Sequence, residues 1–201
     1  MIKNYVFDFG NVLARFDKNM LTAAHVTDRK TVDLIADVLF DRLYWDRLDN
    51  GSITDDEVKS EVCKRLPPDL HDVARTVYDK WVVSMPPIDG MPELIADIKA
   101  KGAKLYLLSN ISVGFAKRYH ECPWIKELFS LFDGLVFSGP IGMTKPNREI
   151  FEYLLEKYSL DAKECIFIDD SELNINGAKA AGLNTYRFDG NADKLREYLH
   201  I

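Results

Sequence analysis

Several residues with nucleophilic, basic or acidic side chains lie at the ends of short apolar runs or in the turns between them. Along the chain they follow the order carboxylate, hydroxyl with amide, lysine and paired carboxylates: Asp8, Ser109, Asn110, Lys145, Asp169 and Asp170. A carboxylate nucleophile, a fixed cation and further carboxylates that could bind a divalent metal are the parts of a phosphoryl-transfer site. The pattern therefore suggests phosphate chemistry.

The apolar runs that carry these residues are typical of buried parallel strands, which read as nearly continuous hydrophobic segments. Helical patterns separate several of the runs, which predicts an open α/β sheet. Carboxyl ends of neighbouring parallel strands converge on one crevice, so residues far apart in sequence can meet there. The expected strands are residues 2–7, 104–108, 135–137, 164–168 and 184–188.

Between the first strand and residue 85 the alternation gives way to successive helical patterns. Thr54 with Glu57 three residues later predicts a capping box, and Asp69 is expected to cap the following helix. Pro86 and Pro87 suggest a hinge back to the sheet. The expected helices are residues 19–26, 30–48, 55–66 and 70–83, with residues 91–101 leading back into the sheet.

We therefore predict a discontinuous core of residues 1–15 and 87–201 and a helical insertion of residues 16–86. The formal net charge of −6, from 26 basic and 32 acidic residues, argues against a nucleic-acid partner. Three cysteines without metal spacing fit a reduced interior, and no apolar stretch approaches the roughly 18 residues that span a bilayer. We expect a cytoplasmic protein that is neither secreted nor inserted in a membrane, and either a monomer or a homodimer.

A carboxylate that approaches a phosphate meets a repulsion of about 4 kcal/mol per pair of unit charges at 4 Å and an effective dielectric near 20. Lys145 would offset part of this as a fixed cation, and Ser109 would donate a hydrogen bond. Oxygen ligands without a histidine or cysteine cluster suit Mg²⁺. The candidate ligands are Asp8, the Gly10 carbonyl and Asp170, with Asp169 close behind.

Each of these residues alone has an ordinary explanation as a strand end, a turn former or a helix cap. Their joint order at strand ends is harder to explain in that way, because a buried strand that ends in two carboxylates is costly without a partner. Taken together, we interpret these residues as parts of one functional site.

The segments DFGNVL, LLSN, TKP and FIDDSELNINGAKAAG resemble the four ordered motifs of the haloacid dehalogenase superfamily. The resemblance implies a Rossmann-like three-layer α/β/α core and a helical cap that closes over a small phosphorylated metabolite. It also implies that Asp8 forms an aspartyl-phosphate, with Ser109, Asn110 and Lys145 on the phosphate and Asp170 in the catalytic set. Mg²⁺ would lie on Asp8, the Gly10 carbonyl and the paired acids Asp169 and Asp170.

One position departs from that pattern. Most phosphatases of the superfamily carry an aspartate two residues after the nucleophile as general acid and base, and this chain has Gly10 there. Its opening is similar to a branch of sugar-phosphate phosphatases that includes hexose 1-phosphate hydrolases, whose anomeric leaving groups need less protonation. Asp17 and Asp46 are open as substitute acids.

Other candidates are weaker. Arg42, Tyr44 and Trp45 lie on an expected helix of the insertion and could touch substrate, although aromatic residues at helical spacing are more often core. Asn174 could orient Asp170, and Gly177 could permit close helix packing.

Other functions stay open at this point. They are metal-free 2-haloacid dehalogenation, against which the paired acids argue, phosphomutase activity, and phosphate-ligand binding without turnover.

Overall fold

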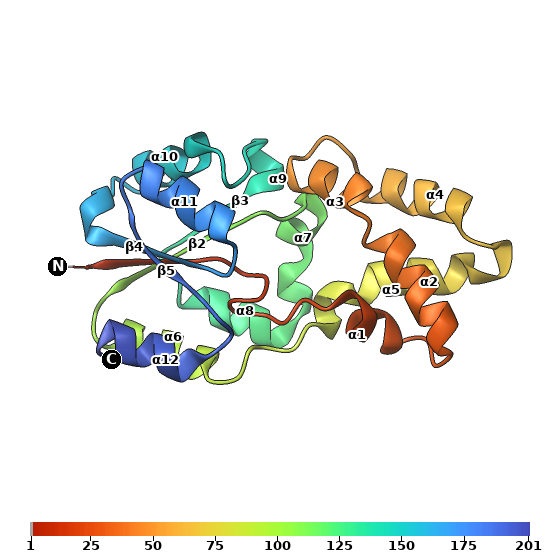
Figure 1. Ribbon diagram of the computed structural model, residues 1–201, viewed down its shortest axis with the longest axis horizontal. Coiled ribbons are helices and arrows are strands. Elements are labelled where there is room, and N and C mark those ends of the chain that lie inside the picture. Colours follow the sequence, from red (N-terminus) through yellow and green to blue (C-terminus); the bar gives the residue numbers. More distant parts are fainter. Residues whose placement is uncertain (1) are drawn as a thin grey trace.

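Five short strands form a parallel sheet with the order β3-β2-β1-β4-β5 (Figure 1). The computed structural model describes residues 2–201. The predicted α/β fold is confirmed, and the first strand of the chain lies at the centre of the sheet. The strands are β1 (Asn4–Phe7), β2 (Lys104–Ser109), β3 (Gly134–Phe137), β4 (Cys165–Asp169) and β5 (Asn184–Arg187).

Helices cover both faces of the sheet, which explains why the central strands read as continuous apolar runs. Neighbouring residues of β1 point to opposite faces: Phe7 packs in one core cluster and Val6 in the other. The cluster around Phe7 includes α6 (Met91–Ala100), α8 (Pro123–Ser130) and α12 (Ala192–Leu199). The cluster around Val6 includes α10 (Arg148–Lys157) and α11 (Glu172–Ala180).

Shorter elements complete this part of the chain. They are α7 (Val113–Arg118), η2 (Tyr119–Glu121), α9 (Ser138–Ile141) and η3 (Ala162–Glu164). Figure 1 shows α7 and α9 on the side of the sheet that faces the inserted helices, with both chain termini at the far side.

The segment between β1 and β2 contains a group of helices with a hydrophobic core of its own, which includes Ile35, Val62 and Val77. No helix within residues 2–201 has the length and apolar character needed to cross a bilayer. The inserted elements are α1 (Lys18–Ala23), α2 (Arg29–Leu39), α3 (Arg42–Asp49), α4 (Asp55–Arg65), η1 (Pro68–Leu70) and α5 (His71–Ser84).

The two chain passages that join the sheet to these helices run side by side. Ala14 and Pro87 form an antiparallel bridge, and the Arg15 N–H donates to the Pro86 carbonyl at 2.9 Å. We propose residues 16–86 as the helical insertion, because this pairing fixes where the chain leaves the sheet and where it returns.

The expected helix over residues 30–48 is wrong, because the chain breaks there into α2 and α3. Asp41 caps α3 by accepting a hydrogen bond from the Leu43 N–H at 2.9 Å. The Trp45 indole donates to the Leu39 carbonyl at 2.9 Å, which satisfies a carbonyl at the end of α2. The break turns α3 toward the carboxyl end of the sheet.

The two cap predictions have different outcomes. Thr54 and Glu57 form the capping box at the start of α4, as expected. The expectation for Asp69 is wrong: it lies inside the short helix η1, and α5 begins at His71 without a side-chain cap. The prolines continue directly into helical turns, so no N-cap position falls on Asp69.

Close helix packing depends on Gly177 of α11, as the sequence suggested. A Cβ atom at this position would overlap the carbonyl oxygen of Pro146, so α11 lies directly against the segment that carries Lys145. Any larger residue would push that segment out of place.

We expect Gly177→Ala to lower the free energy of unfolding by about 1–3 kcal/mol, because the backbone must shift to relieve the overlap. Urea denaturation measures this. Asn176→Ala on the same helix is the control, since Asn176 is exposed. Equal stability of the Gly177→Ala variant and the native protein would contradict this packing.

Candidate active site

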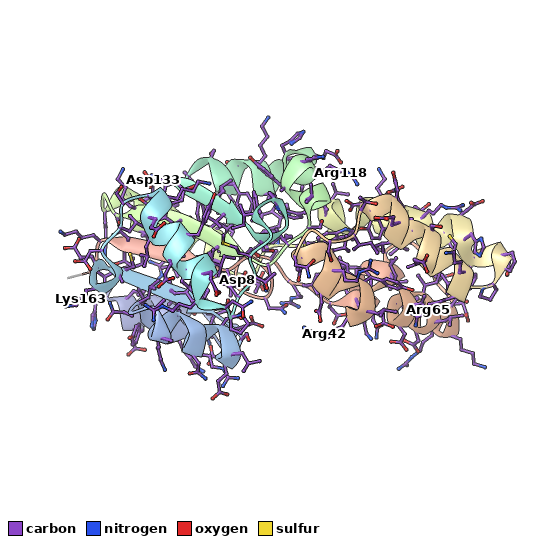
Figure 2. All side chains as sticks on the ribbon, turned by 90° about the horizontal axis from the view of Figure 1, so that it is seen from above. Asp8, Arg42, Arg65, Arg118, Asp133 and Lys163 are labelled. Carbon is purple, nitrogen blue, oxygen red and sulfur yellow. The ribbon has the colours of Figure 1, made fainter. Side chains whose placement is uncertain are left out.

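Three neighbouring strands bring the predicted residues together at one edge of the sheet. Asp8 directly follows β1, and its N–H donates to the Ile168 carbonyl of β4 at 2.9 Å. Ser109 is the last residue of β2, and Asp169 is the last residue of β4. Figure 2 shows Asp8 at the end of the sheet that faces the insertion.

Lys145 lies between two of the carboxylates. Its Nζ is 2.8 Å from Asp8 Oδ1 and 2.7 Å from Asp169 Oδ2, and its side chain is 1% exposed. Asp169 is fully buried, and 8% of Asp8 is exposed. Charges buried this deeply persist only when they are paired, so the three side chains form one electrostatic unit.

Asp169 is held from several directions. Its Oδ1 accepts hydrogen bonds from the Ser171 N–H at 2.8 Å and from Asn174 Nδ2 at 3.1 Å. Asn174 also contacts Oδ2 at 3.1 Å. The expectation that Asn174 orients Asp170 is therefore wrong, because its amide holds Asp169.

Asn110 clamps the backbone of Lys145. Its Nδ2 donates to the Lys145 carbonyl at 2.9 Å, and its Oδ1 accepts from the Lys145 N–H at 2.8 Å. Both ends of the amide are therefore used to position the lysine. Ser109 and Asn110 also line the cavity in front of Asp8.

Burial changes the acidity of the site. It raises the pKa of Asp8 to about 7, with Lys145 opposing the shift and Asp169 adding to it. Burial and the charge of Asp169 also raise the pKa of Asp170. Burial alone would lower the pKa of Lys145, but Asp8 and Asp169 outweigh it, so this pKa is raised and the lysine stays charged.

The arrangement fits a divalent cation. One carboxylate oxygen from each of Asp8, Asp169 and Asp170 lies within 4.8 Å of the others. Three carboxylates carry more negative charge than Lys145 balances, and oxygen atoms are the ligands that Mg²⁺ prefers. The three carboxylates of the expected donor set thus lie close together.

A cavity of about 300 Å³ opens in front of Asp8 and reaches the insertion. Part of its wall is aromatic, with ring centroids 5.3 Å apart for Phe16 and Trp45 and 5.2 Å apart for Trp45 and Trp81. The polar part of the wall includes Asn11 and Arg42. The walls thus come from both the sheet and the inserted helices.

The residues suggested on the insertion separate into three groups. Arg42 and Trp45 line the cavity, whereas Tyr44 is buried in the core of the insertion. Asp17 caps α1, because its side chain accepts hydrogen bonds from the Asn19 and Met20 N–H groups.

Sequence reasoning missed Asn11, Phe16 and Asp49, which also line the cavity. Asn11 has a backbone φ of 55°, an uncommon conformation that its presence in the turn after Asp8 could have suggested. Asp49 gave no signal, because nothing in its local sequence shows which way the end of α3 faces.

Known proteins resemble this chain over most of its length. A D-ribitol-5-phosphate phosphatase of Bacteroides thetaiotaomicron is 27% identical, covering 98% of this chain and 97% of the relative. A sesquiterpene phosphatase of Aspergillus oryzae is 26% identical, covering 90% of this chain and 87% of the relative.

A solved magnesium complex of a haloacid dehalogenase family enzyme from Bacteroides thetaiotaomicron has the same fold. Its TM-score is 0.74 at 24% identity, with 98% of each chain covered. The family model for haloacid dehalogenase-like hydrolases matches residues 2–182, which include all the strand-end residues described above. The chain therefore belongs to the haloacid dehalogenase-like hydrolases.

Proposed function

We propose that this protein is a Mg²⁺-dependent phosphatase that hydrolyses small phosphomonoesters, with sugar phosphates as the favoured class, through an aspartyl-phosphate on Asp8. The observation that carries the proposal is the buried Lys145 between Asp8 and Asp169, with Asp170 beside them at the floor of a cavity. Phosphatase relatives of similar length support it.

The contacts of Asp8 suit it to act as a nucleophile. The Phe9 N–H at 2.7 Å and Lys145 Nζ at 2.8 Å both reach its Oδ1, so the carboxylate is fixed and its Oδ2 is the oxygen that we assign to the attack on phosphorus. Fixing the nucleophile removes much of the entropy cost of the reaction. Lys145 also offsets the repulsion between the carboxylate and the incoming phosphate.

We assign the metal to Asp8, the Gly10 carbonyl and Asp170. Asp169 completes the acidic set, but its oxygens already accept from Lys145, Asn174 and the Ser171 N–H, so its main part is to hold Lys145. When bound, Mg²⁺ supplies positive charge that neutralises the phosphate and the charge that develops in the transition state.

Ser109 is placed to donate a hydrogen bond to a phosphate oxygen, because it ends β2 beside Asp8 and lines the same cavity. Asn110 contributes by fixing Lys145. Water then hydrolyses the aspartyl-phosphate and returns Asp8 to its starting state.

The cavity favours a small leaving group. An aromatic wall that includes Trp45 suits the apolar face of a sugar, and Arg42, Asn11 and Asp49 offer hydrogen bonds to its hydroxyls. A hexose 1-phosphate fits the lack of an acid at Gly10, because its leaving group needs little protonation. Cytoplasmic location, and the choice between monomer and homodimer, stay predictions.

Dehalogenation is the weaker candidate. A (S)-2-haloacid dehalogenase of Pseudomonas is 24% identical over 61% of this chain. The cluster of Asp8, Asp169 and Asp170 is the observation that favours phosphate chemistry instead, since a metal-free attack on carbon has no use for three convergent carboxylates.

We expect the purified protein with Mg²⁺ to release inorganic phosphate from a panel of sugar phosphates and from 4-nitrophenyl phosphate. Asp8→Asn should lower the rate by at least about 10³-fold, because it removes the nucleophile. Asp193→Asn, an exposed change on α12, should leave the rate unchanged. Absence of phosphate release across the panel, or full activity of Asp8→Asn, would refute the proposal.

Mg²⁺ binding should weaken as the pH falls. Asp8 has a raised pKa of about 7, so it is mainly protonated at pH 6 and mainly ionised at pH 8, and protons compete with the cation at the lower pH. Calorimetric titration should show about tenfold tighter binding at pH 8 than at pH 6. Asp170→Asn should bind more weakly at both values. Equal affinity at the two pH values would argue against a carboxylate site.

A further inference from the structure

Asp49 is the last residue of α3, on the part of the insertion that faces the sheet. It lines the cavity that contains Asp8 and also a neighbouring hollow of about 390 Å³ that contains Lys145. Among the described residues that line these two spaces, it is the one acid common to both. Asp49 therefore belongs to the part of the cavity wall that the insertion contributes.

The other acidic side chains near the cavity already have partners or assigned roles. Asp8 contacts Lys145, and Asp170 belongs to the metal cluster. Asp46, one turn earlier on α3, forms an ion pair of 2.8 Å with Arg42, and 58% of its side chain is exposed. Asp17 caps α1. Asp49 is thus the carboxyl group of the insertion that remains available to a leaving group.

The surroundings of Asp49 favour its protonated form near neutral pH. Burial raises its pKa to about 7, the charge of Asp46 adds to the shift, and the positive charges of Lys145 and Arg42 oppose it. Its place at the carboxyl end of a helix acts in the same direction, because the helix dipole disfavours negative charge there. Asp8 and Asp170 line the same cavity, and α9, which packs against α3, carries no charged side chain.

We propose that Asp49 is the general acid and base that replaces the aspartate missing at Gly10, supplied by the insertion instead of the loop after β1. This inference rests on the proposed phosphatase function. It explains why the sheet can lack a proton donor beside the nucleophile: the donor lies on the part of the wall that the insertion contributes, where the leaving-group oxygen points away from Asp8.

The proton balance closes over one turnover. As Asp8 Oδ2 forms its bond to phosphorus, the bond from phosphorus to the leaving-group oxygen breaks, and the Asp49 carboxylic acid gives its proton to that oxygen. The alcohol leaves, and Asp49 is a carboxylate. Water then attacks phosphorus, gives a proton to Asp49 and displaces Asp8, so inorganic phosphate is released and both side chains return to their starting forms.

The test compares leaving groups. Asp49→Asn keeps the size of the side chain but has no acidic proton. We expect it to lower kcat/KM for an alkyl phosphate by about 10²–10⁴-fold, because an alkoxide, unlike an anomeric leaving group, needs protonation to depart. The initial burst of 4-nitrophenolate from 4-nitrophenyl phosphate should persist, since that leaving group departs without a proton, and this burst also reports a folded active site.

The pH profile gives a second readout. In the native enzyme, kcat/KM for the alkyl phosphate should fall as the pH rises above about 7, where Asp49 loses its proton. This decline should be missing in Asp49→Asn. Asp33→Asn, an exposed change on α2 of the insertion, is the control, and it should retain the native leaving-group dependence and pH profile.

A rescue completes the design. A Cβ atom at Gly10 would have no neighbouring atom within 4 Å, so the backbone leaves room for a side chain to start in Gly10→Asp. The double variant Gly10→Asp/Asp49→Asn should have a kcat/KM for the alkyl phosphate at least about tenfold higher than that of Asp49→Asn alone. Native activity of Asp49→Asn on that substrate, with an unchanged pH profile, would overturn the assignment. A native protein that hydrolyses no phosphomonoester at all would instead overturn the phosphatase function itself.

Discussion

The site depends on the contact of one buried lysine with two buried carboxylates. Lys145 lies within 2.8 Å of both Asp8 and Asp169, and water reaches almost none of these side chains. Removing one partner from such a group leaves an uncompensated buried charge, which typically costs about 3–5 kcal/mol. The same cation that stabilises the folded core is therefore the one that prepares Asp8 to meet a phosphate.

Much of the fold serves to hold that lysine in place. The strand order puts β1 between β2 and β4, so Asp8 and Asp169 end side by side although about 160 positions separate them in sequence. Asn110 fixes the Lys145 backbone from the end of β2, and Gly177 lets α11 approach the following Pro146. The insertion closes the opposite side, so the cavity forms only where the two parts meet.

The sheet and its strand-end residues were predictable, because buried parallel strands leave an unbroken apolar pattern and the residues that follow them converge by topology. The break between α2 and α3 was not, since the apolar pattern runs through it and the structure decides it through the Asp41 cap and the Trp45 indole. Asp49 was missed for the same reason: its exposure to the cavity follows from that break. Asn174 was assigned to the wrong aspartate because sequence spacing does not say which carboxylate an amide reaches.

The most direct measurement is the stability of Lys145→Met in buffer free of divalent metal. Removal of the cation should lower the free energy of unfolding by about 3–5 kcal/mol at pH 8, where Asp8, with its pKa raised to about 7, would be ionised without a partner. The loss should shrink at pH 5, because protonation of Asp8 removes its unpaired charge. Lys18→Met, which breaks an exposed ion pair with Asp37, should cost less than about 1 kcal/mol. A Lys145→Met protein as stable as the native one at pH 8 would contradict the account.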